Sequence, residues 1–445
     1  MASPVNPPRG MRDFLPAEKA WRERVLAEIR RTYRAHGFDE IETPVMEDSE
    51  RLHAGLGGDN EKLAFAIMKR GLTIDDLRAA DDALDLADLG LRFDLTVPLA
   101  RFYATHHADL PTVFRAIQIA PVWRAERPQK GRFRQFVQCD IDIIGEAGAA
   151  AEIELLCASV ATLRALGLTR FTIRINDRRI LTSALAALGV AAEAIPDALI
   201  ILDKLDKLGR VGVVAELGEK GFGDVAPRID DLLRRQLTDR DGIESASVSV
   251  PISAESIEAV LPLGTDADAI ASVVAIGDAV AAVAGAGVVE FDPWLVRGMG
   301  YYTGTIFEVA HPEVGYSLGG GGRYDGMIGR FLGAETPAAG FSLGFERIVD
   351  LAALPDDDLA GAVAVIHDGV DPAHLARLQA QLVASGQRVR VERKPRNVSA
   401  LFDQLLASGF TRVATVTADS TVDSLTFREL GGAGPKAPSS GPLGS

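Results

Sequence analysis

The spacing of apolar positions predicts one long helix near the start of the chain. Four apolar residues recur there at helical intervals, and Leu26 widens their stripe: Trp21, Val25, Ile29 and Tyr33. Pro16 suits the first turn of such a helix, and Gly37 suits the position just past its end. We therefore expect a helix between these two residues.

Strand-like patterns follow this helix. Residues 37–48 predict a strand broken by Pro44, and a proline there fits a sheet edge, a strand boundary or an interface. Residues 61–90 predict a polar loop-and-hairpin region, which ends in a strand over 91–101. Residues 113–123 and 133–144 predict two antiparallel strands, which a long basic loop connects.

The rest of the chain has patterns that predict a helical region, a second domain and a tail. A helix is expected over 149–165, then a strand, then mainly helical sequence from about 177 to 288, after which strand patterns resume. Beyond a linker near 351–361, strands and helices alternate, which favours a small α/β domain with a mainly parallel sheet. The Gly/Pro/Ser-rich tail is expected to be disordered, and its final GPLGS resembles a cloning remnant.

Composition places the chain among ordinary soluble proteins. Its 445 residues allow two or three domains, and 24% charged with 47% apolar residues is usual. Cys139 and Cys157 fit reduced thiols of a cytosolic protein better than a disulfide framework. The N-terminus has no signal-peptide core. Residues 269–291 are almost uncharged but hold Asp278 mid-run, so we expect a soluble helix leading into a strand rather than a membrane span.

The charge pattern changes this picture at one place. Acidic residues number 62 against 47 basic ones, a net charge of −15, which argues against non-specific nucleic-acid binding by the whole surface. Five bases nevertheless gather within eleven residues, with Glu126 among them: Arg124, Arg127, Lys130, Arg132 and Arg134. This local patch points to a partner that carries phosphate.

The strand after the patch carries candidate binding residues. Because side chains alternate between faces, one face is polar: Arg134, Phe136, Gln138, Asp140 and Asp142. A solvated outer face is one interpretation. The aromatic ring of Phe136 among polar groups favours another, in which the ring stacks a flat ligand and an arginine covers it.

Other segments supply complementary chemistry. Asp94 and Thr96 project to one face if their segment is extended, which suits a cationic amine, although Asp94 alone also fits an ordinary strand-end acid. Arg297, followed closely by glycines and the pair Tyr301–Tyr302, suits a carboxylate or phosphate, or else a surface turn.

The glycine run Gly319–Gly322 fits neither common phosphate-loop spacing. Arg347, at a strand-to-helix junction, suits a polyphosphate or a helix-end ion pair. Together these groups predict a site for a polyanion, a flat base and a small cationic molecule. No nucleophile set is present, and the seven histidines lack metal-ligand spacing.

The motifs resemble those of a known family. GFDEIETPVMED, FRAIQIAPVWRAERPQKGRFRQFVQCDIDIIGE and GFSLGFERI resemble motifs 1, 2 and 3 of the class II aminoacyl-tRNA synthetases. LVRGMGYYTGTIFE and GGGRYDGMIG resemble two further motifs of the histidyl-tRNA synthetases, and PPRGMRDFLP with NDRRIL and LDKLDKLG agrees. The resemblance covers about residues 7 to 430.

The resemblance implies a fold and its boundaries. An α+β catalytic domain, with a mainly antiparallel sheet flanked by helices, would comprise 1–176 and 289–352. A helical insertion would span 177–288, a linker 353–360, an α/β anticodon-binding domain 361–430 and a disordered tail 431–445. Motif 1 would form a homodimer interface containing Pro44. A cytoplasmic location, without membrane association, would follow.

The resemblance also implies residue roles. ATP would be held by Arg124, Glu126, Phe136 beneath the adenine and Arg347 on the far phosphates, with Mg²⁺ bound to the substrate and no fixed metal site. Histidine would be held at its amino group by Asp94, Thr96 and Gln138, and at its ring by Asp142 and Tyr302, with Tyr301 and Tyr324 lining the pocket. Arg297 would lie between the carboxylate and the α-phosphate. Arg127 and Gln129 would meet the acceptor end of tRNA(His). Asp140 receives no role.

The implied reaction is histidine–tRNA ligation: ATP-dependent formation of histidyl-adenylate, then transfer to the 3′ end of tRNA. Gly300 and the extra glycines before GGRYD depart from the family pattern near the pocket. Two alternatives are a synthetase-like regulatory subunit of ATP phosphoribosyltransferase and a histidine-activating paralogue that does not charge tRNA. The presence of Arg124, Arg297 and Arg347, with an α/β module at 361–430, favours the synthetase over the regulatory subunit.

Overall fold

The computed structural model describes residues 5–53, 63–128, 131–237, 248–297, 302–355 and 362–430. The chain divides into two compact units. The first comprises residues 1–12 and 27–353, and the second comprises residues 13–26 and 354–445. The helix α1 (Pro16–Ala35) was predicted from its apolar spacing, and its Val25, Ile29 and Tyr33 are fully buried.

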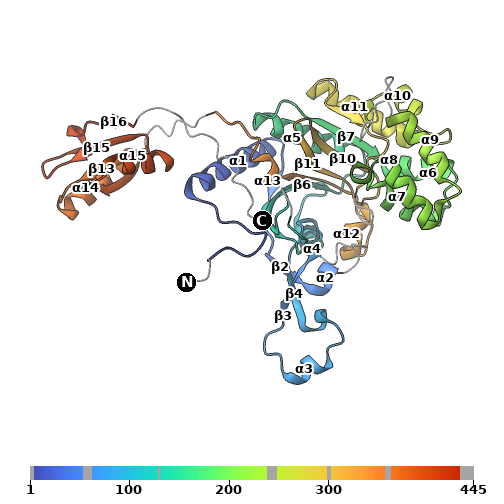
Figure 1. The fold of residues 1–445 in the computed structure, drawn as a ribbon, viewed down its shortest axis with the longest axis horizontal. Coiled ribbons are helices and arrows are strands. Elements are labelled where there is room, and N and C mark those ends of the chain that lie inside the picture. The colour runs from blue at the N-terminus through green and yellow to red at the C-terminus, as the bar shows by residue number, and fades with distance from the viewer. Residues whose placement is uncertain are drawn as a thin grey trace. The chain divides into compact units, whose positions relative to one another are not determined.

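A large, mainly antiparallel sheet organises the first unit, as predicted (Figure 1). Its order within the described residues is β1 (Asp39–Glu40), β5 (Phe114–Trp123), β6 (Gln135–Ile144), β12 (Ala338–Gly344), β11 (Val314–Arg323), β10 (Thr305–His311), β7 (Thr172–Asp177), β9 (Val289–Phe291) and β8 (Val250–Pro251). The central strands from β5 to β7 are antiparallel, while β1 and β9 join the outer edges in parallel.

Helices cover this sheet. The helix α5 (Ala150–Ala165) packs on β6 and β12, and α11 (Ala267–Ala284) packs on α5 and β7. Elsewhere, α4 (Thr96–His106) and α12 (Asp325–Leu332) share a core with the strand ends at Phe114, Ile144 and Ala338. The short α13 (Phe345–Ile348) follows β12 directly and contacts β6.

One apolar helix needs separate mention. Among the described helices, α11 is long and apolar enough to cross a membrane by length and composition. Its Ile270, Val273, Ile276 and Val280 are buried within the unit, and β9 follows it. The predicted sequence of a helix leading into a strand is therefore confirmed.

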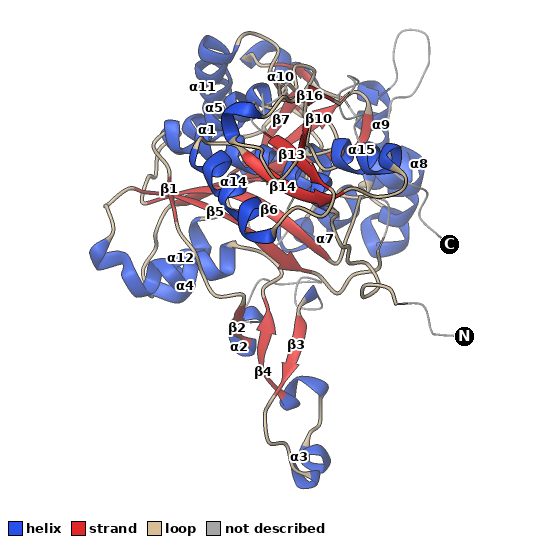
Figure 2. Cartoon of the chain, turned by 90° about the vertical axis from the view of Figure 1, so that its left-hand side faces the viewer, coloured by secondary structure: helices blue, strands red, loops and turns tan. Residues whose placement is uncertain are grey.

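A second sheet projects from the first unit (Figure 2). It contains β2 (Met46–Asp48), β4 (Ala87–Leu91) and β3 (Phe65–Met68), all antiparallel, with the helices α2 (Ser49–His53), α3 (Ile74–Ala79) and η2 (Ala83–Leu86) nearby in the chain. Pro44 lies between β1 and β2, which belong to different sheets. The break predicted at this proline is thus real.

The strand predicted over 91–101 is wrong. β4 ends at Leu91, and α4 begins at Thr96. The Asp94 carboxylate accepts the N–H of Val97 at 3.2 Å and so caps the helix start. Pro98 lies in the first turn, where its missing N–H costs nothing. The inference that Asp94 and Thr96 share a face of an extended strand fails with it.

Helices fill most of the region between β7 and β9. Among the described residues, they are α6 (Arg178–Ala187), η4 (Ala192–Ala194), α7 (Ile195–Leu202), α8 (Leu205–Leu217), η5 (Gly218–Phe222), α9 (Ala226–Leu237), α10 (Ala254–Val260) and α11. Most of them share one apolar core, which Trp294, Leu295 and Val296 also join. The helical content matches the expectation, while the proposed domain boundaries stay a prediction.

The second unit contains a small α/β sheet of order β14 (Arg388–Arg393), β13 (Ala362–His367), β15 (Arg412–Val416) and β16 (Arg428–Glu429). The first three strands are parallel, as predicted, and β16 is antiparallel. Alternate residues of β13 face opposite helices: Ala364 packs with α15 (Val398–Ala407), and Val365 packs with α14 (Pro372–Ala384). The tail predicted to be disordered lies outside the described residues.

Candidate functional site

Neighbouring strands of the large sheet align polar groups in one row. From β5 to β7 the successive cross-strand neighbours are Gln118, Asp140, Ser342, Gly320, Glu308 and Arg174. Gln138, Asp140 and Asp142 of β6 are all at most 9% exposed. The solvated-face interpretation of β6 is therefore wrong, because this polar face is buried.

Glycines make room for the larger groups beside this row. A Cβ on Gly340 would lie 2.0 Å from Oδ1 of Asp142, its partner across the strands. A Cβ on Gly322 would lie 2.9 Å from the ring of Tyr302. Gly319–Gly322 belong to β11, so they form a strand and not a phosphate loop. Because alternate residues of a strand face opposite sides, Gly320 and Gly322 are the two that lie on the face of this row, where Arg297 and Tyr302 approach the strand closely.

An acid and two tyrosines form one end of the candidate site. The Tyr324 hydroxyl donates to Oδ1 of Asp142 at 2.6 Å. Burial raises the pKa of Asp142 to about 7, even though this hydrogen bond opposes the change. Burial also raises the pKa of Tyr302 to about 12, so its hydroxyl is neutral near pH 7. These groups can accept and donate hydrogen bonds to a small polar ring.

A second acidic group lies further along β6. The Gln138 amide donates to Asp140 at 3.3 Å and to the Ser342 hydroxyl at 3.2 Å. Its Oε1 is buried and finds no hydrogen-bond partner among the described residues. Burial raises the pKa of Asp140 well above its usual range, and Asp142 acts in the same direction.

The site as a whole favours a cationic ligand. Burial also raises the pKa of Asp94, which Arg124 partly opposes. The buried acids Asp140 and Asp142 therefore lie near the half-buried Asp94, which raises the pKa of both. An ammonium group would stabilise their charged forms.

The Phe136 ring of β6 lies beside an arginine, as predicted. The Arg124 guanidinium lies 5.0 Å from the centre of the Phe136 ring, and its Nε donates to the carbonyl of Phe93 at 2.9 Å. Glu126 forms an ion pair with Arg132 at 3.4 Å. A planar ligand on the Phe136 ring would thus meet an arginine that the backbone already orients.

Arg347 adds positive charge from α13. Its Nη1 donates to the Ser317 carbonyl at 2.5 Å, and its guanidinium lies 5.2 Å from the Tyr316 ring. Burial lowers its pKa, and the nearby Arg132 and Arg297 act in the same direction. These contacts hold Arg347 by carbonyls and a ring, unlike the helix-end ion pair considered above, and its neighbours suit a polyanion.

Arg297 lies in an ion pair with Glu308, at 2.5 Å between Nη1 and Oε2. Thr96 begins α4, and Arg127 is exposed in the basic loop. Gln129, Gly300 and Tyr301 lie outside the described residues, so their predicted roles rest on the resemblance alone. Among the residues that are described, no three His, Cys, Asp or Glu side chains gather as metal ligands.

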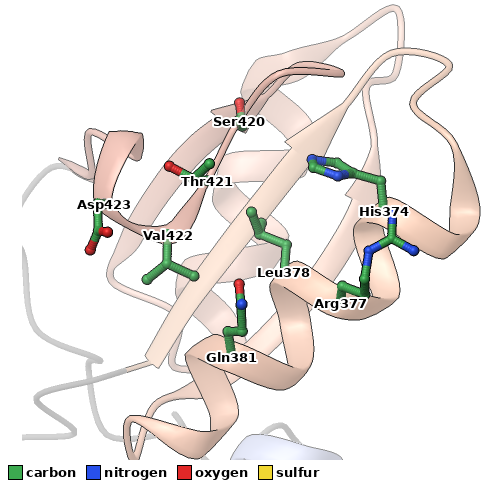
Figure 3. A pocket seen from close by; sticks show the side chains of 8 residues that line it. All are labelled: His374, Arg377, Leu378, Gln381, Ser420, Thr421, Val422 and Asp423. Atoms are coloured by element: carbon green, nitrogen blue, oxygen red, sulfur yellow. The ribbon is translucent and has the colours of Figure 1, made fainter.

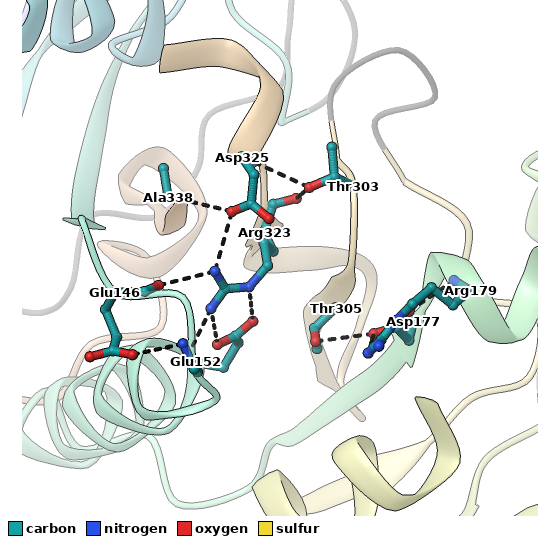
Figure 4. Close-up of polar contacts among 10 residues, drawn as sticks. Glu146, Glu152, Asp177, Arg179, Thr303, Thr305, Arg323, Asp325 and Ala338 are labelled. Atoms are coloured by element: carbon teal, nitrogen blue, oxygen red, sulfur yellow. Dashed lines mark hydrogen bonds and ion pairs between the residues drawn. The ribbon is translucent and has the colours of Figure 1, made fainter. Parts of the chain in front are cut away.

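The sequence interpretation missed a buried anchor beside the tyrosines (Figure 4). Arg323 donates to both Glu152 oxygens at 2.7 Å and to Asp325 at 3.2 Å, and its carbonyl accepts the Thr303 N–H at 2.7 Å. These bonds tie the segments carrying Tyr302 and Tyr324 to α5. The arginine beside Tyr324 in GGGRYDG was the available clue.

A second anchor, Glu346, was also missed. Its Oε1 accepts the N–H of Val137 at 3.3 Å, and its Oε2 accepts a hydrogen bond from Arg12 at 2.6 Å. This buried carboxylate attaches the N-terminal segment to β6, next to Phe136. Its position in GFERI beside Arg347 gave no hint of that contact.

The second unit has a hollow of its own between α14 and η6 (Val422–Ser424) (Figure 3). Its volume is about 350 Å³, and six of the eight residues that line it have polar side chains: His374, Arg377, Gln381, Ser420, Thr421 and Asp423. No site residue was predicted here.

Comparisons with known proteins agree with these features. The family model described as histidyl-tRNA synthetase matches residues 10–348. A histidine–tRNA ligase of Leifsonia xyli subsp. xyli is 57% identical over 436 residues, covering 97% of this chain and 99% of that protein. A probable histidine–tRNA ligase of Tropheryma whipplei is 44% identical over 397 residues, covering 87% and 90%.

Solved structures give the same fold. The histidyl-tRNA synthetase from Nostoc sp. PCC 7120 superposes with a TM-score of 0.73 at 25% identity, covering 96% of this chain and 95% of that one. A Bacillus halodurans protein described as an ATP phosphoribosyltransferase regulatory subunit/histidyl-tRNA synthetase gives a TM-score of 0.70 at 21% identity, covering 90% and 97%. The second likeness concerns the fold alone.

Proposed function

The chain belongs to the histidyl-tRNA synthetase family, and from this premise we propose how its own residues carry out the reaction. It is a histidine–tRNA ligase, which activates histidine with ATP and transfers it to tRNA. The near-full-length identity to such ligases does not favour the regulatory-subunit or paralogue alternatives.

Asp142 and Tyr302 bind the imidazole nitrogens of histidine, and Tyr324 and Tyr301 line the same pocket. The buried Asp142–Tyr324 hydrogen bond is the observation that carries this assignment. Groups that hydrogen-bond the ring reject analogues lacking its nitrogens, because buried polar groups would be left unpaired.

The α-ammonium of histidine lies near Asp94, Thr96 and Gln138. The Oε1 of Gln138, which has no hydrogen-bond partner in the described part of the chain, and the raised pKa of the Asp94 carboxyl support this position. The ammonium group of histidine would donate a hydrogen bond to the Gln138 amide oxygen and would stabilise the ionised form of Asp94. Both effects favour binding of the substrate.

ATP lies with its adenine on Phe136. Arg124 and Glu126 hold ATP, Arg347 clamps the far phosphates, and Mg²⁺ is bound to the substrate. The closeness of Arg124 to the Phe136 ring supports the adenine position. The positive charge around Arg347 supports a place for the far phosphates.

Arg297 lies between the histidine carboxylate and the α-phosphate. A carboxylate oxygen attacks the α-phosphorus, the bond from that phosphorus to the bridging oxygen breaks, and pyrophosphate leaves with the electron pair. The carboxylate is already a nucleophile, so catalysis consists of positioning and charge stabilisation.

The tRNA contacts and the assembly are inferred from the family. Arg127 and Gln129 meet the acceptor end of tRNA(His), and the α/β domain at 361–430 contacts the anticodon. Two chains form a homodimer through residues 37–48, with Pro44 at the interface. The reaction takes place in the cytoplasm.

The assignment of Arg297 is tested by histidine-dependent exchange of pyrophosphate into ATP. Exchange should be present in the purified protein, and Arg297→Ala should lower its rate by roughly two orders of magnitude or more, since the arginine stabilises the developing charge. Near-normal exchange by a folded Arg297→Ala variant would remove this residue from the mechanism. Charging of tRNA(His) with labelled histidine then checks the second step.

A further inference from the structure

We propose that Glu308 and Arg174 form a positioning pair that holds the Arg297 guanidinium in its reactive orientation. The inference rests on the role of Arg297 given under the proposed function. It assigns to two residues of β10 and β7 a part in the activation step that they perform without contacting the substrates.

The strand register places the three parts together. Glu308 lies opposite Arg174 of β7 on one side and opposite Gly320 of β11 on the other. Cross-strand neighbours point to the same face of a sheet, so these positions project into the same space as the row that includes Asp140. The arrangement therefore belongs to the reactive face.

The missing side chain of Gly320 locates the arginine. A Cβ on this glycine would lie 2.5 Å from Nη1 and 2.8 Å from Cζ of Arg297. The guanidinium thus lies directly over the strand at Gly320. One oxygen of the neighbouring Glu308 then contacts Nη1 at 2.5 Å.

Arg174 shares the negative charge of the Glu308 carboxylate with Arg297. It binds the other oxygen of Glu308, and it also contacts Asp292 at 3.0 Å. A carboxylate paired with Arg297 alone would compete with the anionic substrates for that arginine. By sharing the charge of Glu308, Arg174 lets the carboxylate orient Arg297 through one oxygen without neutralising it.

The same pair fixes the segment that leads to Arg297. Asp292 accepts the N–H of Trp294 at 2.9 Å, and Asn176 of β7 donates to the Asp292 carbonyl at 2.8 Å. Arg174 is therefore joined both to the base of this segment and, through Glu308, to the guanidinium at its end. Two points of attachment restrict the position of Arg297 before the substrates arrive.

The experiment measures pyrophosphate exchange by the full chain. Glu308→Gln keeps the shape and an oxygen acceptor but removes the charge. We expect kcat to fall roughly tenfold to a hundredfold, as for other small misplacements of reacting groups, with the KM for histidine changed less than about twofold. Glu313→Gln is the matched control, because Glu313 forms an exposed ion pair with Arg170 in the turn between β10 and β11.

A double-mutant cycle tests whether Glu308 acts through Arg297. In an Arg297→Ala background, Glu308→Gln should change the residual rate by less than about twofold, because coupled residues are not additive. The proposal would be overturned if Glu308→Gln lowered kcat in the Arg297→Ala background as much as it does alone. It would also be overturned if Glu308→Gln raised the KM for histidine and left kcat unchanged. Near-normal exchange by Arg297→Ala alone would instead defeat the proposed role of Arg297 itself.

A variant of Arg174 tests the same pair from its other member, so the proposal stays testable if Glu308→Gln alone does not fold. Arg174→Met leaves Glu308 free to pair fully with Arg297, so exchange should fall. Adding Glu308→Gln to Arg174→Met should then restore part of the rate. A purely structural role predicts further loss in the double variant, and that result would contradict the proposal.

Discussion

At the scale of single residues, the site depends on acids whose charged forms are unfavourable in the ligand-free protein. Asp142 is buried, keeps one hydrogen bond from Tyr324 and has a pKa of about 7. A ligand that donates a hydrogen bond to this carboxylate would favour its charged form. The same burial that weakens the empty site therefore strengthens selection for the correct ring.

The raised pKa of Asp142 predicts a pH-dependent stability difference. The folded protein keeps the proton up to about pH 7, whereas the unfolded chain releases it near the ordinary value of 3.8. The stability contributed by protonated Asp142 is thus fully present below pH 4 and is lost as the pH rises through 7. Relative to Asp142→Asn, which does not titrate, the unsubstituted protein should lose about 1.4 kcal/mol of unfolding free energy per pH unit between about pH 4 and pH 7.

Chemical unfolding of both proteins at pH 5 and pH 8 measures this difference. Asp88→Asn is the control, because Asp88 is exposed on β4. A parent-to-variant difference in the free energy of unfolding that stays constant between pH 5 and pH 8 would show that Asp142 is already charged at pH 5.

At the scale of elements, the tyrosine-bearing segments owe their position to α5. Arg323 at the end of β11 forms a bidentate pair with Glu152, which is only 2% exposed. Asp325 then accepts the N–H of Ala338 at 2.9 Å and links the start of α12 to β12. One buried ion pair therefore joins β11, α12 and α5.

We predict that Arg323→Met destabilises the first unit by roughly 3–5 kcal/mol, because it leaves the Glu152 carboxylate buried without its partner. The double variant Arg323→Met/Glu152→Met should recover much of the loss, since it removes the uncompensated charge as well. Denaturant unfolding measures both. Equal destabilisation by the single and double variants would mean that packing, and not the charge, sets the cost.

Local chemistry also explains the main error at this scale. Residues 91–101 contain strand-forming residues and a proline, and they were predicted as a strand. The Asp94 side chain caps Val97, and Pro98 falls in a first helical turn that tolerates it, so a helix begins at Thr96. The overlooked indication was Asp94 itself, which lies three residues before Val97, whose amide N–H it accepts in the first turn of the helix.

At the scale of the whole molecule, an acidic protein must bind a polyanion. The net charge of −15 repels tRNA at long range, so binding has to rely on local groups such as the basic loop at 124–134. Salt screens the repulsion and also reduces the gain from releasing counterions, and the second effect dominates for direct phosphate contacts.

We therefore predict that the affinity for tRNA(His) falls as salt rises, with a slope in log–log form of roughly 0.7–0.9 per phosphate contact. Arg127→Ala should lower the slope by about one contact. Histidine-dependent pyrophosphate exchange by the parent needs no tRNA and should depend less on salt. Filter binding across a salt series measures the slope, and an unchanged slope for Arg127→Ala would exclude its contact with phosphate.

The sequence by itself determined most of the elements, though not the helix that begins at Thr96, together with the alternation of polar and apolar faces on β6 and the motifs that indicate the family. Those features are local: helical or strand periodicity, capping residues and short motifs depend on neighbours in the chain. The antiparallel pairing of 113–123 with 133–144 followed in the same way, because a single loop connects them.

Only the tertiary structure decided which strands became neighbours and what that did to the side chains. Asp140 had no role in the sequence, yet it lies in a row with Ser342, Gly320, Glu308 and Arg174, which are far away in the chain. Burial, close approach over glycines and shared ion pairs depend on this register. They determine the raised pKa of Asp142 and the partner of Arg297, and no local pattern encodes them.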